Sequence, residues 1–183
     1  MRPGPGLAGV TKEMVMSYPV DAFVRMSSGE APNGTLMFLR DFWTLAAEIE
    51  VPAGPKKKSL MLTGNERGKF YDRLEGVNDI GIAIAPGVSF ELRITDPTSR
   101  TADGTYPSPG AVAVTPDGRP QIWVCGPSSE HDRRGFYLNG GEVAGEEHEH
   151  RPFIYFKSYE VWLTRGGKTL SDKPLFVVGQ PAA

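Results

Sequence analysis

The chain has 183 residues, 39% of them hydrophobic and 23% charged, which suits one globular domain with a two-layer core. A formal net charge of −2, with Lys and Arg scattered along the chain, argues against nucleic-acid binding. No signal peptide is visible, and no apolar run reaches the ~20 residues of a membrane helix. We therefore expect a soluble chain that is made in the cytoplasm and has no membrane partner.

Glycine and proline are frequent, with 22 Gly and 16 Pro, while 9 Phe, 6 Tyr and 3 Trp argue against disorder. This composition predicts many short strands joined by tight turns. The single cysteine, Cys125, cannot form an internal disulfide, so packing or assembly must stabilise the chain. It follows three apolar residues, and we expect a buried, inert thiol.

Both ends of the chain differ from its middle. Residues 1–9 form an arm rich in Pro and Gly, and residues 180–183 form a tail. Residues 10–179 are expected to form a single β-sandwich domain with an N-terminal helical segment, as argued from its strands below. The arm has no core of its own, so a neighbouring subunit is the expected means of holding it. Arg2, Pro3 and Pro5 are therefore candidate interaction residues.

Residues 20–26 are compatible with a strand, and residues 35–51 have apolar side chains at helical spacing. With Asn33 as a candidate cap and Pro52 as a stop, a helix is predicted near residues 35–50. A strand remains open as the alternative, because Leu36, Phe38 and Phe42 also fall on alternate positions.

Residues 52–59 are predicted to form a basic loop around Lys56, Lys57 and Lys58. The glycine spacing of a phosphate-binding loop is absent. The lysines are interpreted as a solvated turn or as an electrostatic contact to an acidic neighbour.

Residues 88–95 place an apolar side chain on every second position, which is the period of a half-buried strand. Residues 80–85 alternate similarly, and Pro86-Gly87 between them predicts a hairpin. A two-residue turn would, however, pair Ile82 with Glu91 and set apolar against polar faces. The hairpin therefore requires either a bulge or cover on both of its faces.

Residues 95–109 form a long polar loop in which Tyr106 is a candidate contact residue. Residues 111–115 and 121–125 flank an Asp-Gly turn and predict a second hairpin. Further strands are expected at residues 135–138, 153–164 and 175–178. This pattern predicts an all-β fold, an antiparallel two-sheet sandwich that resembles a jelly roll.

The histidines offer the one candidate metal site. His148 and His150 would project from one face of a strand, with His131 as a possible third ligand. The spacing is similar to the His-x-His pair of cupins, but residues 153–155 stand where a cupin has its glutamate. The alternatives are a solvated acidic loop and a pH-sensitive contact.

No other catalytic motif is present, and residues 126–129 do not match a nucleophile elbow. We therefore expect no cofactor and no enzymatic activity. Three aromatic residues, Tyr106, Trp123 and Tyr137, are candidates for a sugar-binding face, although core packing explains Trp123 equally well.

Together these observations predict a structural or assembly protein that binds other copies of itself or other subunits and no nucleic acid. Its most concrete form is a virion subunit of a bacteriophage, in a capsid-decorating or tail-associated position. A carbohydrate- or ligand-binding sandwich is the alternative, and a cupin-like metal-dependent enzyme is the third hypothesis.

Overall fold

A computed structural model describes residues 17–51, 53–73, 80–101, 107–115, 118–125, 133–139, 142–143 and 154–179. Within these ranges every strand pair is antiparallel. The elements run in the order η1 (Val20–Ala22), β1 (Phe23–Ser27), β2 (Leu36–Leu39), β3 (Phe42–Val51), β4 (Gly54–Met61), β5 (Phe70–Asp72), β6 (Ile80–Ile84), β7 (Ser89–Ile94), η2 (Pro97–Ser99), β8 (Val112–Val114), β9 (Pro120–Cys125), β10 (Arg133–Tyr137), β11 (Glu142–Val143), β12 (Tyr159–Arg165), β13 (Lys168–Thr169) and β14 (Phe176–Val178).

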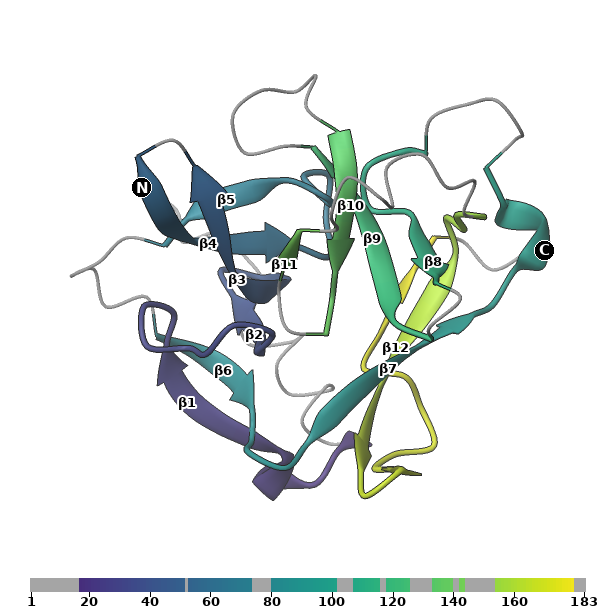
Figure 1. Cartoon of the computed structure of the whole chain (residues 1–183). Helices are drawn as coiled ribbons and strands as arrows, with labels where there is room; N and C mark the ends of the chain where they lie inside the picture. The colour runs from purple at the N-terminus through teal and green to yellow at the C-terminus, as the bar shows by residue number, and fades with distance from the viewer. Residues whose placement is uncertain are drawn as a thin grey trace, which may run out of the picture.

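One layer of the fold is a six-stranded sheet with the order β1-β6-β2-β3-β4-β5 (Figure 1). The other layer combines two sheets. One has the order β11-β10-β9-β8, and the other is built around β12, which pairs with β7, β13 and β14. Phe156 bridges both Val112 of β8 and Arg100, so the two sheets meet at this residue. The prediction of an all-β antiparallel sandwich is confirmed.

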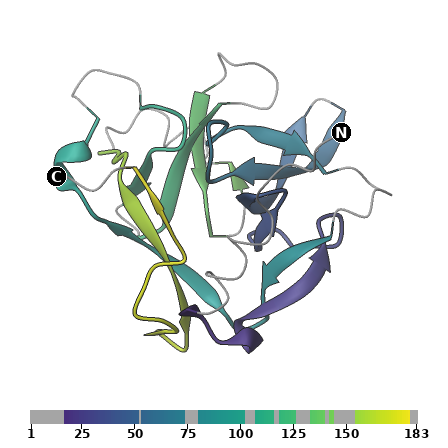
Figure 2. The same cartoon turned by 180° about the vertical axis from the view of Figure 1, so that it is seen from behind.

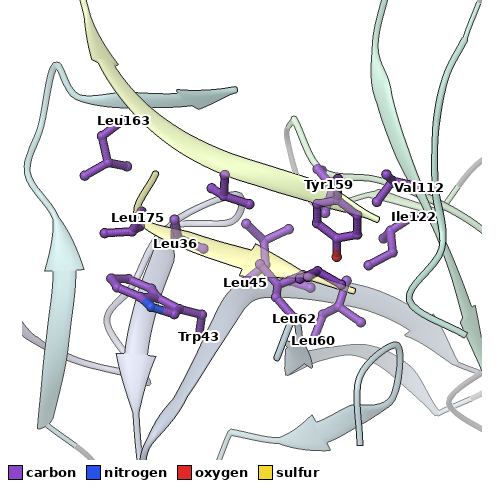
Figure 3. Packing of buried hydrophobic residues seen from close by; sticks show 14 of the residues in the cluster. Leu36, Trp43, Leu45, Leu60, Leu62, Val112, Ile122, Tyr159, Leu163 and Leu175 are labelled. Carbon is purple, nitrogen blue, oxygen red and sulfur yellow. The ribbon is translucent and has the colours of Figure 1, made fainter. Parts of the chain in front are cut away.

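The main hydrophobic core lies between the layers and takes side chains from all three sheets (Figure 3). Trp43 of β3 stacks on Phe176 of β14 with ring centroids 5.7 Å apart. Phe70 of β5 meets Phe136 of β10 edge to face at 5.3 Å. These pairs join strands of opposite layers, which fixes the layers against each other.

The predicted helix near residues 35–50 is wrong, because this segment forms β2, a tight turn and β3. Trp43, Leu45 and Ala47 face the main core, whereas Ala46 packs into a second apolar cluster on the outer face. Both faces of β3 are thus buried in this stretch. A strand with two buried faces reads as a continuous apolar run, which has no clear period of two.

We call this second cluster, formed by Ala31, Met37, Ala46 and Ala83, the outer cluster. Residues 28–33 contribute Ala31 to it, and Arg73 holds this segment in place. Its buried guanidinium donates to the carbonyl oxygens of Ser28 and Ala31, both at 2.9 Å, and of Ala47 at 2.7 Å. Burial lowers the pKa of Arg73. We call these hydrogen bonds the Arg73 clamp. They explain why Met37 and Ala46 are buried although both face away from the main core.

The predicted hairpin of residues 80–95 is also wrong, because β6 and β7 belong to different layers. β6 pairs with β1 and β2, whereas β7 pairs with β12. The turn at Gly87, with φ of 81°, carries the chain from one layer to the other. Ile84 and Leu92 therefore both face the same core without being paired, which removes the register conflict.

The hairpin predicted for residues 111–125 is confirmed. β8 pairs with β9 from Val112 opposite Ile122 to Val114 opposite Pro120. Gly118 has φ of 81°, a conformation that glycine adopts without steric cost.

Candidate functional site

The three lysines predicted to form a basic loop lie instead in β4. Because side chains alternate along a strand, Lys57 projects from the opposite face to Lys56 and Lys58. Lys57 donates to the Gly29 carbonyl at 3.2 Å, and Lys58 pairs with Asp72 at 2.5 Å. The hydrogen bond from Lys58 lowers the pKa of Asp72. The prediction of a basic loop is therefore wrong and the three lysines do not share one face, while their role as interaction residues stays a prediction.

Several predicted site residues lie outside the described residues, namely Arg2, Pro3, Pro5, Tyr106, His131, His148 and His150. In the part of the chain that the structure describes, no three His, Cys, Asp or Glu side chains are grouped so that they could hold a metal ion.

The aromatic residues proposed for a sugar-binding face are buried where they are described. Trp123 is 8% exposed and packs edge to face on Tyr155, with ring centroids 5.4 Å apart. Tyr137 is 2% exposed and lies under the guanidinium of Arg119. Neither ring is open to a sugar. Cys125 is a buried free thiol, as expected.

The outer face of β7 and β12 carries a polar network whose groups bind one another. The Arg93 guanidinium lies 4.3 Å from the centre of the Trp162 ring and pairs with Glu91. The Trp162 indole N–H donates to Glu160 at 2.7 Å. Because these groups are paired internally, we interpret this face as a solvated surface.

The free side of β1 is the remaining candidate, and we call it the β1 edge. β1 pairs with β6 on one side, and no described strand lies beyond it on the other (Figures 1 and 2). The Ala22 carbonyl accepts from the Ala85 N–H at 2.9 Å, which fixes the phase of the ladder. By alternation, Val24 and Met26 direct their backbone groups to β6, and Phe23, Arg25 and Ser27 direct theirs outward.

Four of the outward backbone groups have no partner among the described residues. The Phe23 N–H already bonds to Val20, and the Ser27 carbonyl accepts from the Glu30 N–H. The Phe23 carbonyl, the Arg25 N–H and carbonyl, and the Ser27 N–H remain. These groups form a short ladder centred on Arg25 that a further strand can complete.

Apolar side chains flank this ladder on both faces of the sheet. Val24 and Met26 are half-buried on the outer face, where they pack against the outer cluster. On the inner face Arg25 lies opposite Ile82, and Ser27 lies opposite Ile80, whose side chain is 47% exposed. Arg25 itself is exposed and forms no ion pair with a described residue.

Other strands at sheet margins are short or charged. β5 has three residues and includes Asp72, which pairs with Lys58. β7 has six residues but carries the ion pair of Glu91 and Arg93. Short length and surface charge are the usual protections of an edge strand. The β1 edge has only Arg25 as a charged residue, so it is the least protected of these three margins.

Sequence analysis did not identify this site. Residues 20–26 were compatible with a strand, but nothing in them indicated its position at the margin of a sheet. Comparison with family models, curated proteins and solved structures finds no match for the chain. No helix among the described residues is long and apolar enough to cross a membrane.

Proposed function

We propose that this chain is a structural or assembly protein that acts through protein–protein contacts. The observation that carries the proposal is the β1 edge, where four backbone groups have no partner among the described residues. Half-buried Val24 and Met26 and exposed Ile80 flank these groups. Strand addition at such an edge is a recurrent mode of protein recognition, because the main-chain bonds supply affinity without a deep pocket. The partner is another subunit of a larger assembly.

The most concrete form of this proposal is a virion subunit, in the capsid-decorating or tail-associated position of a bacteriophage. The arm of residues 1–9, rich in Pro and Gly, suits a segment held by a neighbouring subunit. The net charge of −2 suits the outside of a particle better than a surface facing the genome.

The proposal is tested by sedimentation of the tagged full-length chain from its native source through a density gradient. We expect wild-type protein to sediment with a particle much larger than itself. The variant Arg25→Pro should leave the particle, because it removes an outward N–H and no bond to β6. Val177→Lys is the matched control, since Val177 is 47% exposed on a different sheet.

Two results would contradict the proposal. Wild-type protein that sediments as a monomer, under conditions that keep large assemblies intact, would exclude a stable place in an assembly. Equal loss of sedimentation in Arg25→Pro and Val177→Lys would show that the β1 edge is not the contact.

A further inference from the structure

We propose that the β1 edge binds an extended segment of another protein that carries an acidic residue between two apolar residues. This inference rests on the proposed function and specifies the partner at the same site. The segment pairs antiparallel with β1, as every described strand pair in this fold does, and its acidic residue lies directly opposite Arg25.

The backbone determines which partner residue lies opposite Arg25. In an antiparallel ladder, a residue with both backbone groups directed outward exchanges two hydrogen bonds with the residue facing it. Arg25 is the one residue of β1 that offers both an N–H and a carbonyl. The Phe23 carbonyl and the Ser27 N–H add one bond each. Only a register centred on Arg25 uses all four groups.

The charge of Arg25 selects the residue at this central position. Directly opposite residues in such a pair have side chains on the same face, with Cα atoms about 5.5 Å apart. Arg25 is exposed, and its neighbour in β6 is the uncharged Ile82. No described carboxylate pairs with Arg25, so a carboxylate in the incoming strand is its natural complement, whereas a lysine there would be repelled.

The flanking residues of the partner face the other side of the sheet. They lie beside Val24 and Met26, which are half-buried on the apolar outer face. Apolar partner residues at these two positions extend that cluster and remove more apolar surface from water. The recognised pattern is thus apolar, acidic, apolar.

A second copy of β1 does not fit this pattern. Two β1 strands related by a two-fold axis use all four groups only when Arg25 of one copy faces Arg25 of the other. Like charges directly opposite each other destabilise strand pairing. The edge therefore disfavours the symmetric dimer and favours a chemically different strand.

The test uses the full-length chain and two capped heptapeptides with alternating valine and threonine, one with a central glutamate and one with a central lysine. Binding is followed by backbone NMR shifts of residues 23–27. We expect the glutamate peptide to bind about five-fold more tightly than the lysine peptide, as one favourable cross-strand charge pair implies. Arg25→Glu should reverse the preference, and Lys168→Glu, an exposed charge reversal on β13, should leave it unchanged.

A third peptide, N-methylated at the central glutamate, cannot donate to the Arg25 carbonyl and should lose binding. The proposal is overturned if no peptide shifts the β1 resonances, or if Arg25→Glu keeps the preference for glutamate. It is also overturned if wild-type chains cross-link to each other through β1, since a second copy would then be the occupant.

These outcomes separate the inference from the proposed function. A chain that sediments with a particle but ignores the peptides keeps its assembly role and loses this partner assignment. A chain that binds the glutamate peptide but sediments as a monomer keeps the strand-binding site and loses the assembly role.

Discussion

Arg25 of β1 lies directly opposite Ile82 of β6 and is the only charged residue in its strand. A charged side chain on an edge strand hinders pairing with a second copy of the same edge. We therefore expect Arg25→Val to promote self-association through β1, which sedimentation velocity would detect as a concentration-dependent dimer or larger species. Arg25→Lys keeps the charge and should behave like wild type. If Arg25→Val has the same solution mass as wild type throughout the concentration range, Arg25 does not protect the edge.

A buried hydrogen bond between Tyr155 and Gln121 leads to a prediction about the free energy of unfolding. The Tyr155 hydroxyl donates to the Gln121 side-chain oxygen at 2.8 Å, and Gln121 is 1% exposed. Tyr155→Phe leaves that oxygen without its donor, so we expect a loss of about 1–3 kcal/mol in the free energy of unfolding. Urea denaturation monitored by tryptophan fluorescence measures this loss.

Tyr159→Phe is the matched control for this substitution. Tyr159 is 1% exposed, and its hydroxyl has no hydrogen-bond partner among the described residues. Removing an unpaired buried hydroxyl should leave the free energy of unfolding unchanged or raise it slightly. Equal losses in the two variants would show that the bond from Tyr155 to Gln121 contributes nothing specific.

The same two tyrosines predict a loss of stability at high pH. Burial raises the pKa of both Tyr155 and Tyr159 above the ordinary value of about 10. Above pH ~10 the unfolded chain releases these protons while the folded chain keeps them, so the free energy of unfolding falls as pH rises. It should be unaffected by these groups below pH ~9. Urea denaturation across this range measures the slope, which the double variant Tyr155→Phe, Tyr159→Phe should reduce. An unchanged slope would contradict the prediction.

Local sequence patterns predicted the strands whose two faces differ. In residues 89–94, Phe90, Leu92 and Ile94 alternate with polar residues and pack against the core, as expected. The partner of this strand was not predictable in the same way. β12 begins at residue 159, and nothing local distinguishes it from the nearer strand β6 as a partner.

Residues 36–51 show why other features needed the structure. Their apolar run resembles a helix because both faces of β2 and β3 are covered, and the outer cover depends on a contact from Arg73 to residues 28–33. Such a long-range contact leaves no periodic trace in the sequence. The β1 edge was missed for a related reason, since the position of a strand at the margin depends on the order of the whole sheet.

The Arg73 clamp itself is testable. Arg73→Met removes four hydrogen bonds, to Ser28, Ala31, Asn33 and Ala47, and leaves their acceptors under an apolar side chain. We expect the free energy of unfolding to fall by about 3 kcal/mol, because bonds to a charged group are among the stronger ones. Native-state hydrogen exchange should show the largest loss of protection at the Glu30 and Gly34 amides.

Arg73→Lys and Lys57→Met serve as controls for the clamp. Arg73→Lys keeps the charge but offers fewer donors in a different geometry, so its loss should be intermediate. Lys57 is exposed and makes one bond to the same segment, so Lys57→Met should cost less than about 1 kcal/mol. If Arg73→Met cost no more than Lys57→Met, residues 28–33 would be held by other contacts.

The turn between β2 and β3 gives the last prediction. Arg40 and Asp41 have φ of 47° and 70°, and they connect Leu39 to its partner Phe42 in a two-residue turn. Both central residues of this turn type need positive φ. That conformation is energetically unfavourable for a residue with a side chain, but not for glycine. Asp41→Gly should therefore raise the free energy of unfolding by about 0.5–1 kcal/mol in urea denaturation.

Gly87→Ala is the control with the opposite expected sign. At Gly87 φ is 81° and an added Cβ would meet nothing within 4 Å, so only the backbone is strained. It should lower the free energy of unfolding by about 1 kcal/mol. The two changes should thus have opposite signs, and a loss of stability in Asp41→Gly would mean that contacts of the Asp41 side chain outweigh the strain of its backbone.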